Sequence, residues 1–175
     1  MNAANRPTPP EALKDRLRGA IAFPITPYAA DGSVDLNAVK SNASWLADYQ
    51  ICAMVAPSGT GEIFGLSPDE CAQVTAATTE AVNKRLPVIA AVGFNARIGS
   101  DLAQRAERAG ADGILVMPPY YATPDPQGLL AYYQQVAAGR SAQRGTSGAT
   151  TGGGGRSAPD PYRRRNLVGL QVGLL

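Results

Sequence analysis

The 175-residue sequence contains no histidine, only three lysines and only two cysteines. Without histidine the chain cannot form a Ser-His-Asp or Cys-His catalytic centre, nor a metal site with imidazole ligands. Cys52 and Cys71 cannot supply a Cys₄ zinc site or a framework of several disulfides. No run of about 18 apolar residues is present, and the first ten residues lack the apolar segment of a secretory signal. We therefore expect a cytoplasmic protein that does not span a membrane.

Net charge is also small, because 16 Lys and Arg nearly balance 14 Asp and Glu. The balance hides two regions of opposite sign. Residues 1–138 hold 10 basic and 13 acidic side chains, whereas residues 139–165 hold six arginines, seven glycines and one acid. The second stretch has no Val, Ile, Leu, Met, Phe or Trp, so it cannot bury enough apolar surface to offset the entropy of ordering. We expect residues 1–10 and 139–175 to be disordered and residues 11–138 to form the folded part.

Residues 11–138 alternate between short apolar runs and segments with helical signals. The apolar runs, which predict strands, are 20–25, 51–56, 87–92 and 113–117. None of them alternates polar with apolar residues, which is typical of parallel strands buried on both faces. Helices are predicted after Asp35, after the Ser67-Pro68-Asp69-Glu70 capping box, over 98–109 with Gly110 as the stop, and after Asp125-Pro126.

Four consecutive βα units are typical of a (β/α)₈ barrel or of a doubly wound sheet. A doubly wound sheet usually carries a glycine-rich phosphate turn after its first strand, and Phe23-Pro24-Ile25-Thr26-Pro27 offers none. The sequence therefore favours an α/β fold built from about four βα units of a TIM barrel. A complete barrel takes about 250 residues. The chain thus corresponds to the N-terminal half of a barrel, followed by a disordered Gly/Arg-rich tail.

The loop after the second predicted strand is the best candidate for a ligand site, because both folds bind ligands at the carboxyl ends of their strands. Ser58 and Thr60 supply hydroxyl groups, and Gly59 and Gly61 let the backbone approach a ligand closely. The backbone amides of such a turn can also face a carboxylate. A tight βα turn chosen only for its backbone explains the pattern equally well. Glu62 is a candidate acid or base, or a contact to a neighbouring loop.

Tyr120 and Tyr121 follow the fourth predicted strand, where a phenol could bind substrate or relay a proton. An aromatic pair packed at a barrel rim or a subunit contact is the simpler interpretation. Cys71 lies in the first turns of a helix, where a thiolate could be stabilised, but a buried and inert thiol is the more common case.

Taken together and in this order, four motifs give residues 12–137 a specific resemblance to a known family. They are Phe23-Pro24-Ile25-Thr26-Pro27, Gly59-Thr60-Gly61-Glu62 with Leu66-Ser67-Pro68-Asp69-Glu70, Ala106-Glu107-Arg108-Ala109-Gly110-Ala111-Asp112-Gly113, and Pro118-Pro119-Tyr120-Tyr121. The chain resembles the dihydrodipicolinate synthase / N-acetylneuraminate lyase family of Schiff-base (β/α)₈ enzymes. The Gly-Thr-Gly-Glu form is similar to the 5-dehydro-4-deoxyglucarate dehydratase branch, whereas the tyrosine pair is similar to the synthases.

The resemblance implies a lyase that acts on a small 2-keto acid in carbohydrate acid catabolism. A strand-end lysine would form an imine that serves as an electron sink. Ser58, Gly59 and Thr60 would bind the substrate carboxylate, and Tyr121 would support proton relay. No metal or organic cofactor is implied, and full-length relatives form homo-oligomers. In the dehydratase branch, water and then CO₂ would leave to give 2,5-dioxopentanoate; the alternative is a 4-hydroxy-tetrahydrodipicolinate synthase or another pyruvate-type aldolase.

The lysine that this chemistry needs is not recognisable. Lys14 precedes the first predicted strand, Lys40 lies within a helix, and Lys84 precedes the third strand. Asn166-Leu167-Val168-Gly169 resembles the start of the family's lysine strand, but the lysine does not follow. An Arg/Gly-rich stretch between two family-like pieces is what a frame disruption near residue 138 would produce. We therefore expect a truncated or frame-disrupted chain with no activity of its own.

A function of a different class is an acidic α/β domain with an Arg/Gly tail that binds nucleic acid. The six arginines could contact phosphates. Only Tyr162 offers a stacking ring in residues 139–165, which argues against this function. We expect no nucleic-acid partner.

Overall fold

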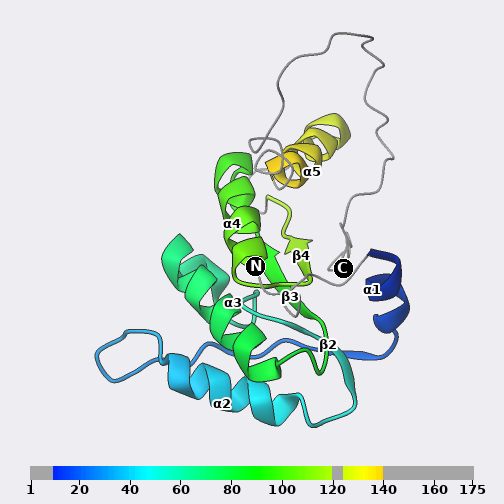
Figure 1. The fold of residues 1–175 in the computed structure, drawn as a ribbon. Helices are drawn as coiled ribbons and strands as arrows, with labels where there is room; N and C mark the ends of the chain where they lie inside the picture. The colour runs from blue at the N-terminus through cyan, green and yellow to red at the C-terminus, as the bar shows by residue number, and fades with distance from the viewer. Residues whose placement is uncertain (1–9, 120–123, 140–175) are drawn as a thin grey trace, which may run out of the picture.

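The computed structural model describes residues 10–119 and 124–139. Four strands and five α-helices alternate along this part of the chain (Figure 1). In order they are α1 (Pro10–Arg16), β1 (Ala20–Ala22), α2 (Leu36–Leu46), β2 (Ile51–Val55), η2 (Ile63–Gly65), α3 (Pro68–Val82), β3 (Val88–Val92), α4 (Ala96–Arg108), β4 (Gly113–Val116) and α5 (Pro126–Gly139). The expected disorder of residues 1–9 and 140–175 lies outside the described residues.

The four strands form one parallel sheet in the order β1-β2-β3-β4. Each strand thus pairs with the next strand of the sequence, and the crossover helices pack against one another in the same order, α2 on α3 and α4 on α5. Figure 1 shows α2, α3, α4 and α5 following one another around the outside of the sheet. Parallel crossovers are right-handed, so a sheet without a reversal of strand order keeps its helices on one face. This arrangement is an arc of a (β/α)₈ barrel and not a doubly wound sheet, as the sequence predicted.

The apolar runs of β3 and β4 form strands that are covered on both faces, whereas in β1 Ala20 is exposed and Ile21 and Ala22 are only half-buried. All five residues of β3 and all four of β4 are buried. The predicted helix signals are also present: Asp35 caps α2 through the amides of Asn37 and Ala38, and the capping box of Ser67 and Glu70 begins α3. Gly110, with φ of 88°, follows the end of α4 in the left-handed conformation that favours glycine.

Two element boundaries differ from the prediction by two residues or more, and one helix was not predicted. β1 ends at Ala22 instead of residue 25, because Pro24 has no N–H with which to continue the ladder to β2. α4 begins at Ala96, two residues before the predicted start, because the Asn95 side chain accepts from the amide of Ile98 and caps the helix. α1 was not predicted.

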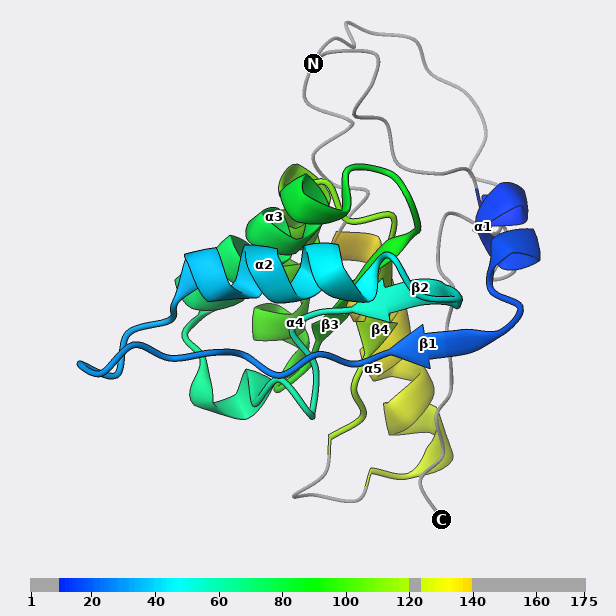
Figure 2. The same ribbon diagram turned by 90° about the horizontal axis from the view of Figure 1, so that it is seen from below.

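α1 lies at the amino ends of the strands, as Figure 2 shows, and its Leu13 is 2% exposed. Gly113 begins β4 there, and a Cβ on Gly113 would lie 3.3 Å from a Leu13 methyl group. The preceding residue, Asp112, is also buried, accepts from the amide of Val88 and lies 3.5 Å from Lys84 Nζ. The Ala111-Asp112-Gly113 part of the third motif therefore stabilises the amino end of the sheet, opposite the candidate site.

Candidate functional site

The candidate site lies at the carboxyl end of β2, where the chain turns through Ser58, Gly59 and Thr60 before η2. Ser58 is 1% exposed, and within the part of the chain that the structure describes its hydroxyl has no hydrogen-bond partner. A buried hydroxyl without a partner costs free energy, and a water, an ion or a ligand can supply the missing partner. Gly59 and Thr60 are exposed beside it. The three predicted substrate-binding residues are thus adjacent at one strand end, one hydroxyl buried and the other facing solvent.

The turn is closed by two backbone hydrogen bonds. The amide of Glu62 donates to the Gly59 carbonyl at 3.1 Å, and the amide of Ile63 donates to the Ser58 carbonyl at 3.0 Å. Glu62 has a φ of 57° in the left-handed region, which directs the chain into η2. Ile63 is fully buried and anchors the far end of the turn in the core.

A neighbouring strand end holds the turn in place. The Thr26 hydroxyl, which follows β1, donates to the Gly61 carbonyl at 2.6 Å, and Thr26 is 6% exposed. Gly61 fits closely: a Cβ there would lie 3.1 Å from both the Pro24 carbonyl oxygen and Thr26 Oγ1, and 3.3 Å from the Ser58 amide nitrogen. Glycine at position 61 is therefore required by close backbone packing, which the sequence predicted only as a general property of the loop.

Two aromatic side chains from neighbouring loops meet beside the turn, and the sequence analysis did not identify this pair. Phe64 and Phe94 meet edge to face with ring centroids 5.3 Å apart, which joins the loop after β2 to the loop after β3. Phe94 has a φ of 72°, an unusual conformation for a bulky residue, of the kind that functional sites often retain. Burial raises the pKa of the Tyr28 phenol, and the negative charges of Glu62 and Glu70 raise it further, so the phenol stays protonated near this loop.

A hydrogen bond joins the carboxyl end of β4 to α5. The hydroxyl of Tyr132 donates to the Met117 carbonyl at 2.9 Å, and burial raises the pKa of this phenol to about 12. Tyr121, the predicted catalytic tyrosine, lies outside the described residues together with Tyr120.

None of the three lysines lies at the carboxyl end of a strand. Lys14 is in α1, Lys40 in α2 pairs with Glu80 at 2.8 Å, and Lys84 lies between α3 and the amino end of β3. The sequence predicted these positions correctly. In the described residues, therefore, no lysine is placed to attack a keto acid bound at Ser58.

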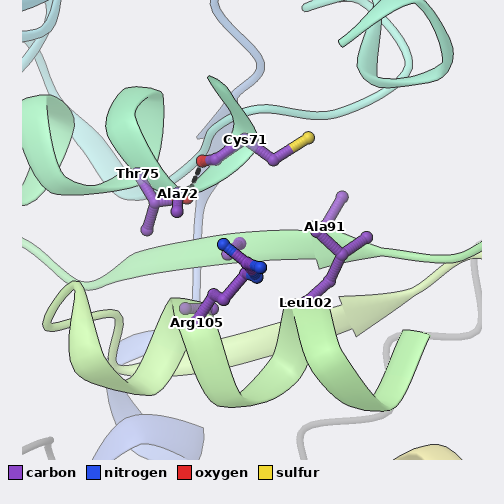
Figure 3. A pocket seen from close by; sticks show the side chains of 8 residues that line it. Cys71, Ala72, Thr75, Ala91, Leu102 and Arg105 are labelled. Carbon is purple, nitrogen blue, oxygen red and sulfur yellow. Dashed lines mark hydrogen bonds between the residues drawn. The ribbon is translucent and has the colours of Figure 1, made fainter. Parts of the chain in front are cut away.

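A small pocket lies elsewhere, between α3, α4 and β3 (Figure 3). It is lined by Cys71, Ala72, Thr75, Ala90, Ala91, Leu102, Arg105 and Ala106. Burial, with the charge of Glu70, raises the pKa of the Cys71 thiol to about 11, so the thiol is inert at neutral pH. Arg105 is held by Asp69 and Asp101. The pocket belongs to the packing of the helix layer and not to the site at the strand ends.

Two further features of the described residues bear on function. No group of three or more His, Cys, Asp and Glu side chains in them is arranged to hold a metal ion. None of their helices has the length and apolar character required to cross a membrane.

Comparison with known proteins assigns the chain to a family. A profile described as the dihydrodipicolinate synthetase family matches residues 16–143. One curated relative, named probable 5-dehydro-4-deoxyglucarate dehydratase from Bradyrhizobium diazoefficiens, is 38% identical over 131 residues. The match covers 75% of this chain and 42% of the relative, so the chain spans less than half the length of the curated relatives it matches.

Solved structures show the same partial coverage. Dihydrodipicolinate synthase from Bacillus clausii matches with a TM-score of 0.69 and 28% identity, over 74% of this chain and 44% of that one. The enzyme from Acinetobacter baumannii, solved with pyruvate, matches with a TM-score of 0.66 and 32% identity, over 70% of this chain and 43% of that one. The strand order and the loop at the end of β2 are consistent with these matches. The chain belongs to the dihydrodipicolinate synthetase family.

Proposed function

We propose that this chain is the N-terminal, substrate-carboxylate-binding half of a Schiff-base lyase, most like 5-dehydro-4-deoxyglucarate dehydratase. The observation that carries the proposal is the buried hydroxyl of Ser58, which has no partner in the described residues and lies beside Gly59 and Thr60 at a strand end. A carboxylate accepts hydrogen bonds from hydroxyl and amide groups, and bonds to a charged acceptor are stronger than neutral ones. The names of the curated relatives support the dehydratase branch.

In this proposal Ser58, Gly59 and Thr60 hold the carboxylate of a small 2-keto acid. A lysine on a later strand attacks the keto carbon, loses water and forms an imine. The imine accepts the electron pair when a proton leaves the neighbouring carbon, and Tyr121 relays protons between donor and acceptor. Loss of water and then of CO₂ from the bound substrate, followed by hydrolysis of the imine, releases 2,5-dioxopentanoate and regenerates the lysine amine. The reaction takes place in the cytoplasm and needs no metal or organic cofactor.

The chain by itself is proposed to be inactive, because its lysines lie away from the carboxyl ends of the described strands. In this proposal the partial barrel consists of residues 11–138. The remaining residues, 139–175, are the product of a frame disruption. Resequencing the gene tests this part directly. Motifs of the fifth and sixth strands are expected in an alternative frame, and their absence from every frame would overturn the frame disruption.

A 4-hydroxy-tetrahydrodipicolinate synthase, or another aldolase that uses pyruvate, is the competing activity. The solved synthase from Acinetobacter baumannii, which carries pyruvate, supports a keto acid substrate but does not separate the two activities. Gly59 favours the dehydratase, because synthases commonly have a hydroxyl residue at this position. The two activities differ in product, since only the dehydratase releases CO₂.

A chimera separates the activities. Residues 1–138 of this chain replace the matching half of the Bradyrhizobium diazoefficiens relative, whose remaining half supplies the later strands. We expect CO₂ release from 5-dehydro-4-deoxyglucarate. A folded chimera that instead condenses pyruvate with an aldehyde would establish the synthase alternative, and a folded chimera that does neither would refute the proposed site.

Two variants of the chimera test the role of the loop. Ser58→Ala removes the buried hydroxyl, and we expect KM to rise roughly 10- to 100-fold because a hydrogen bond to a carboxylate contributes about 1.5–3 kcal/mol. Ser41→Ala is the matched control, because Ser41 is an exposed residue of α2. Equal KM values for the two variants would exclude carboxylate binding by Ser58.

A further inference from the structure

The two outer strands of the sheet, β1 and β4, each have a strand neighbour on one side only within the described residues. An edge strand presents unpaired backbone groups, and a closed barrel removes such edges. The segment after β1 also exposes apolar side chains: Phe23 is 37%, Ile25 63% and Tyr28 42% exposed. We propose that the β1 edge pairs with the β4 edge of a second copy of this chain, so that two half barrels close one eight-stranded barrel about a twofold axis.

The stagger of the sheet determines how the edges meet. Ala22 pairs with Met54, and Met54 pairs with Val88. Ile89 pairs with Gly113, so one residue earlier Val88 is level with Asp112, and the register runs across the sheet from Ala22 to Asp112. A (β/α)₈ barrel has a shear of about eight residues over its circumference, and a half barrel accounts for about four. Asp112 of one copy is then level with a position four residues from Ala22 in the other.

The four-residue shift can run toward the amino end or toward the carboxyl end of β1, and only the first direction places β4 of one copy beside β1 of the other. Counting toward the amino end, Asp112 is level with Arg18, and residues 114–116 of β4 lie beside Ala20–Ala22, the whole of β1. Counting the other way, residues 114–116 lie beside 28–30, beyond the end of β1 and past Pro27. The observed register thus makes the two edges coincide over the full length of β1 at the shear of a (β/α)₈ barrel.

A second copy is the occupant that satisfies both edges at once. Each copy offers one β1 edge and one β4 edge, and a twofold axis pairs both of them in the same step. Pairing two β1 edges, or two β4 edges, would leave the other edges open to further chains. Pro24 and Pro27 lack N–H groups, which limits pairing at the β1 edge to the short stretch that β4 covers.

Sedimentation velocity of the full chain at micromolar concentration measures the assembly. We expect a species with twice the 18.1 kDa mass of one chain. Ile25→Lys places a charge beside the β1 seam and is expected to raise the dimer dissociation constant at least roughly tenfold. Trp45→Lys is the matched control, because Trp45 is 57% exposed, close to the 63% of Ile25, but lies in α2 on the helix layer. We expect this variant to leave the dissociation constant unchanged.

Cysteine crosslinking tests the register in a Cys52→Ser, Cys71→Ala background. Ala22→Cys with Val116→Cys places two thiols on level positions, and oxidation is expected to give a covalent dimer. Ala22→Cys with Ile114→Cys keeps the same face but is out of register by two residues, or roughly 6.6 Å, beyond the reach of a disulfide. A monomer, open-ended aggregates, or equal crosslinking of the two pairs would each overturn the proposal.

Discussion

Replacing Thr26 with valine tests whether the end of β1 holds the candidate substrate loop. The exchange keeps the shape of the side chain but removes the hydroxyl that donates to the Gly61 carbonyl at 2.6 Å. Thr26 is 6% exposed and Gly61 is also buried, so no water replaces the lost donor. An unsatisfied buried carbonyl costs about 1–3 kcal/mol, and we expect the free energy of unfolding to fall by that amount.

Urea denaturation followed by circular dichroism measures this loss in the full chain, and hydrogen exchange measures local opening of residues 57–66. Thr26→Ser is the control, because it keeps the hydroxyl and removes only a methyl group, at a cost of about 0.8 kcal/mol. We expect faster exchange of the loop amides in Thr26→Val than in Thr26→Ser. Equal stability and equal exchange in the two variants would refute the reasoning, since the hydrogen bond would then contribute nothing to the loop.

Three further changes test other contacts. Ser67→Ala removes the α3 cap and costs about 1 kcal/mol by urea denaturation. Hydrogen bonds from the Ser67 backbone and then from its side chain hold the pKa of Glu70 below its usual value, so wild-type stability falls as pH drops through that lowered pKa. Ser67→Ala removes the side-chain bond and reduces this dependence in acid titrations. Gly99→Ala places a Cβ 3.0 Å from a Val136 methyl group and lowers the thermal midpoint through about 1–3 kcal/mol of overpacking. Tyr132→Phe removes the hydrogen bond between α5 and the end of β4, and we expect the free energy of unfolding to fall by about 1 kcal/mol in thermal denaturation.

Local signals in the sequence predicted much of the fold. The apolar runs became parallel strands, and Asp35, Ser67 and Glu70 form the caps that their spacing indicated. These features depend on residues within one turn of each other, so a single sequence contains the information. The choice of a barrel over a doubly wound sheet rested on the absence of a phosphate turn, and the strand order confirmed it.

Features that depend on distant residues were not predicted. The bond between Thr26 and Gly61 spans 35 positions, and the edge-to-face pair of Phe64 and Phe94 joins two separate loops. Leu13 of the short α1 packs against Gly113 of β4, which lies far away along the chain. In the candidate site, the sequence identified Ser58 as a hydroxyl donor, but only the structure shows that this hydroxyl is buried without a partner in the described residues.

We propose that the chain has the carboxylate-binding half of a Schiff-base site and lacks the lysine that would form the imine. Incubation of the full chain with pyruvate and borohydride, followed by mass spectrometry of its peptides, tests this claim most directly. We expect no reduced adduct on Lys14, Lys40 or Lys84. A stoichiometric adduct on any of the three would contradict it.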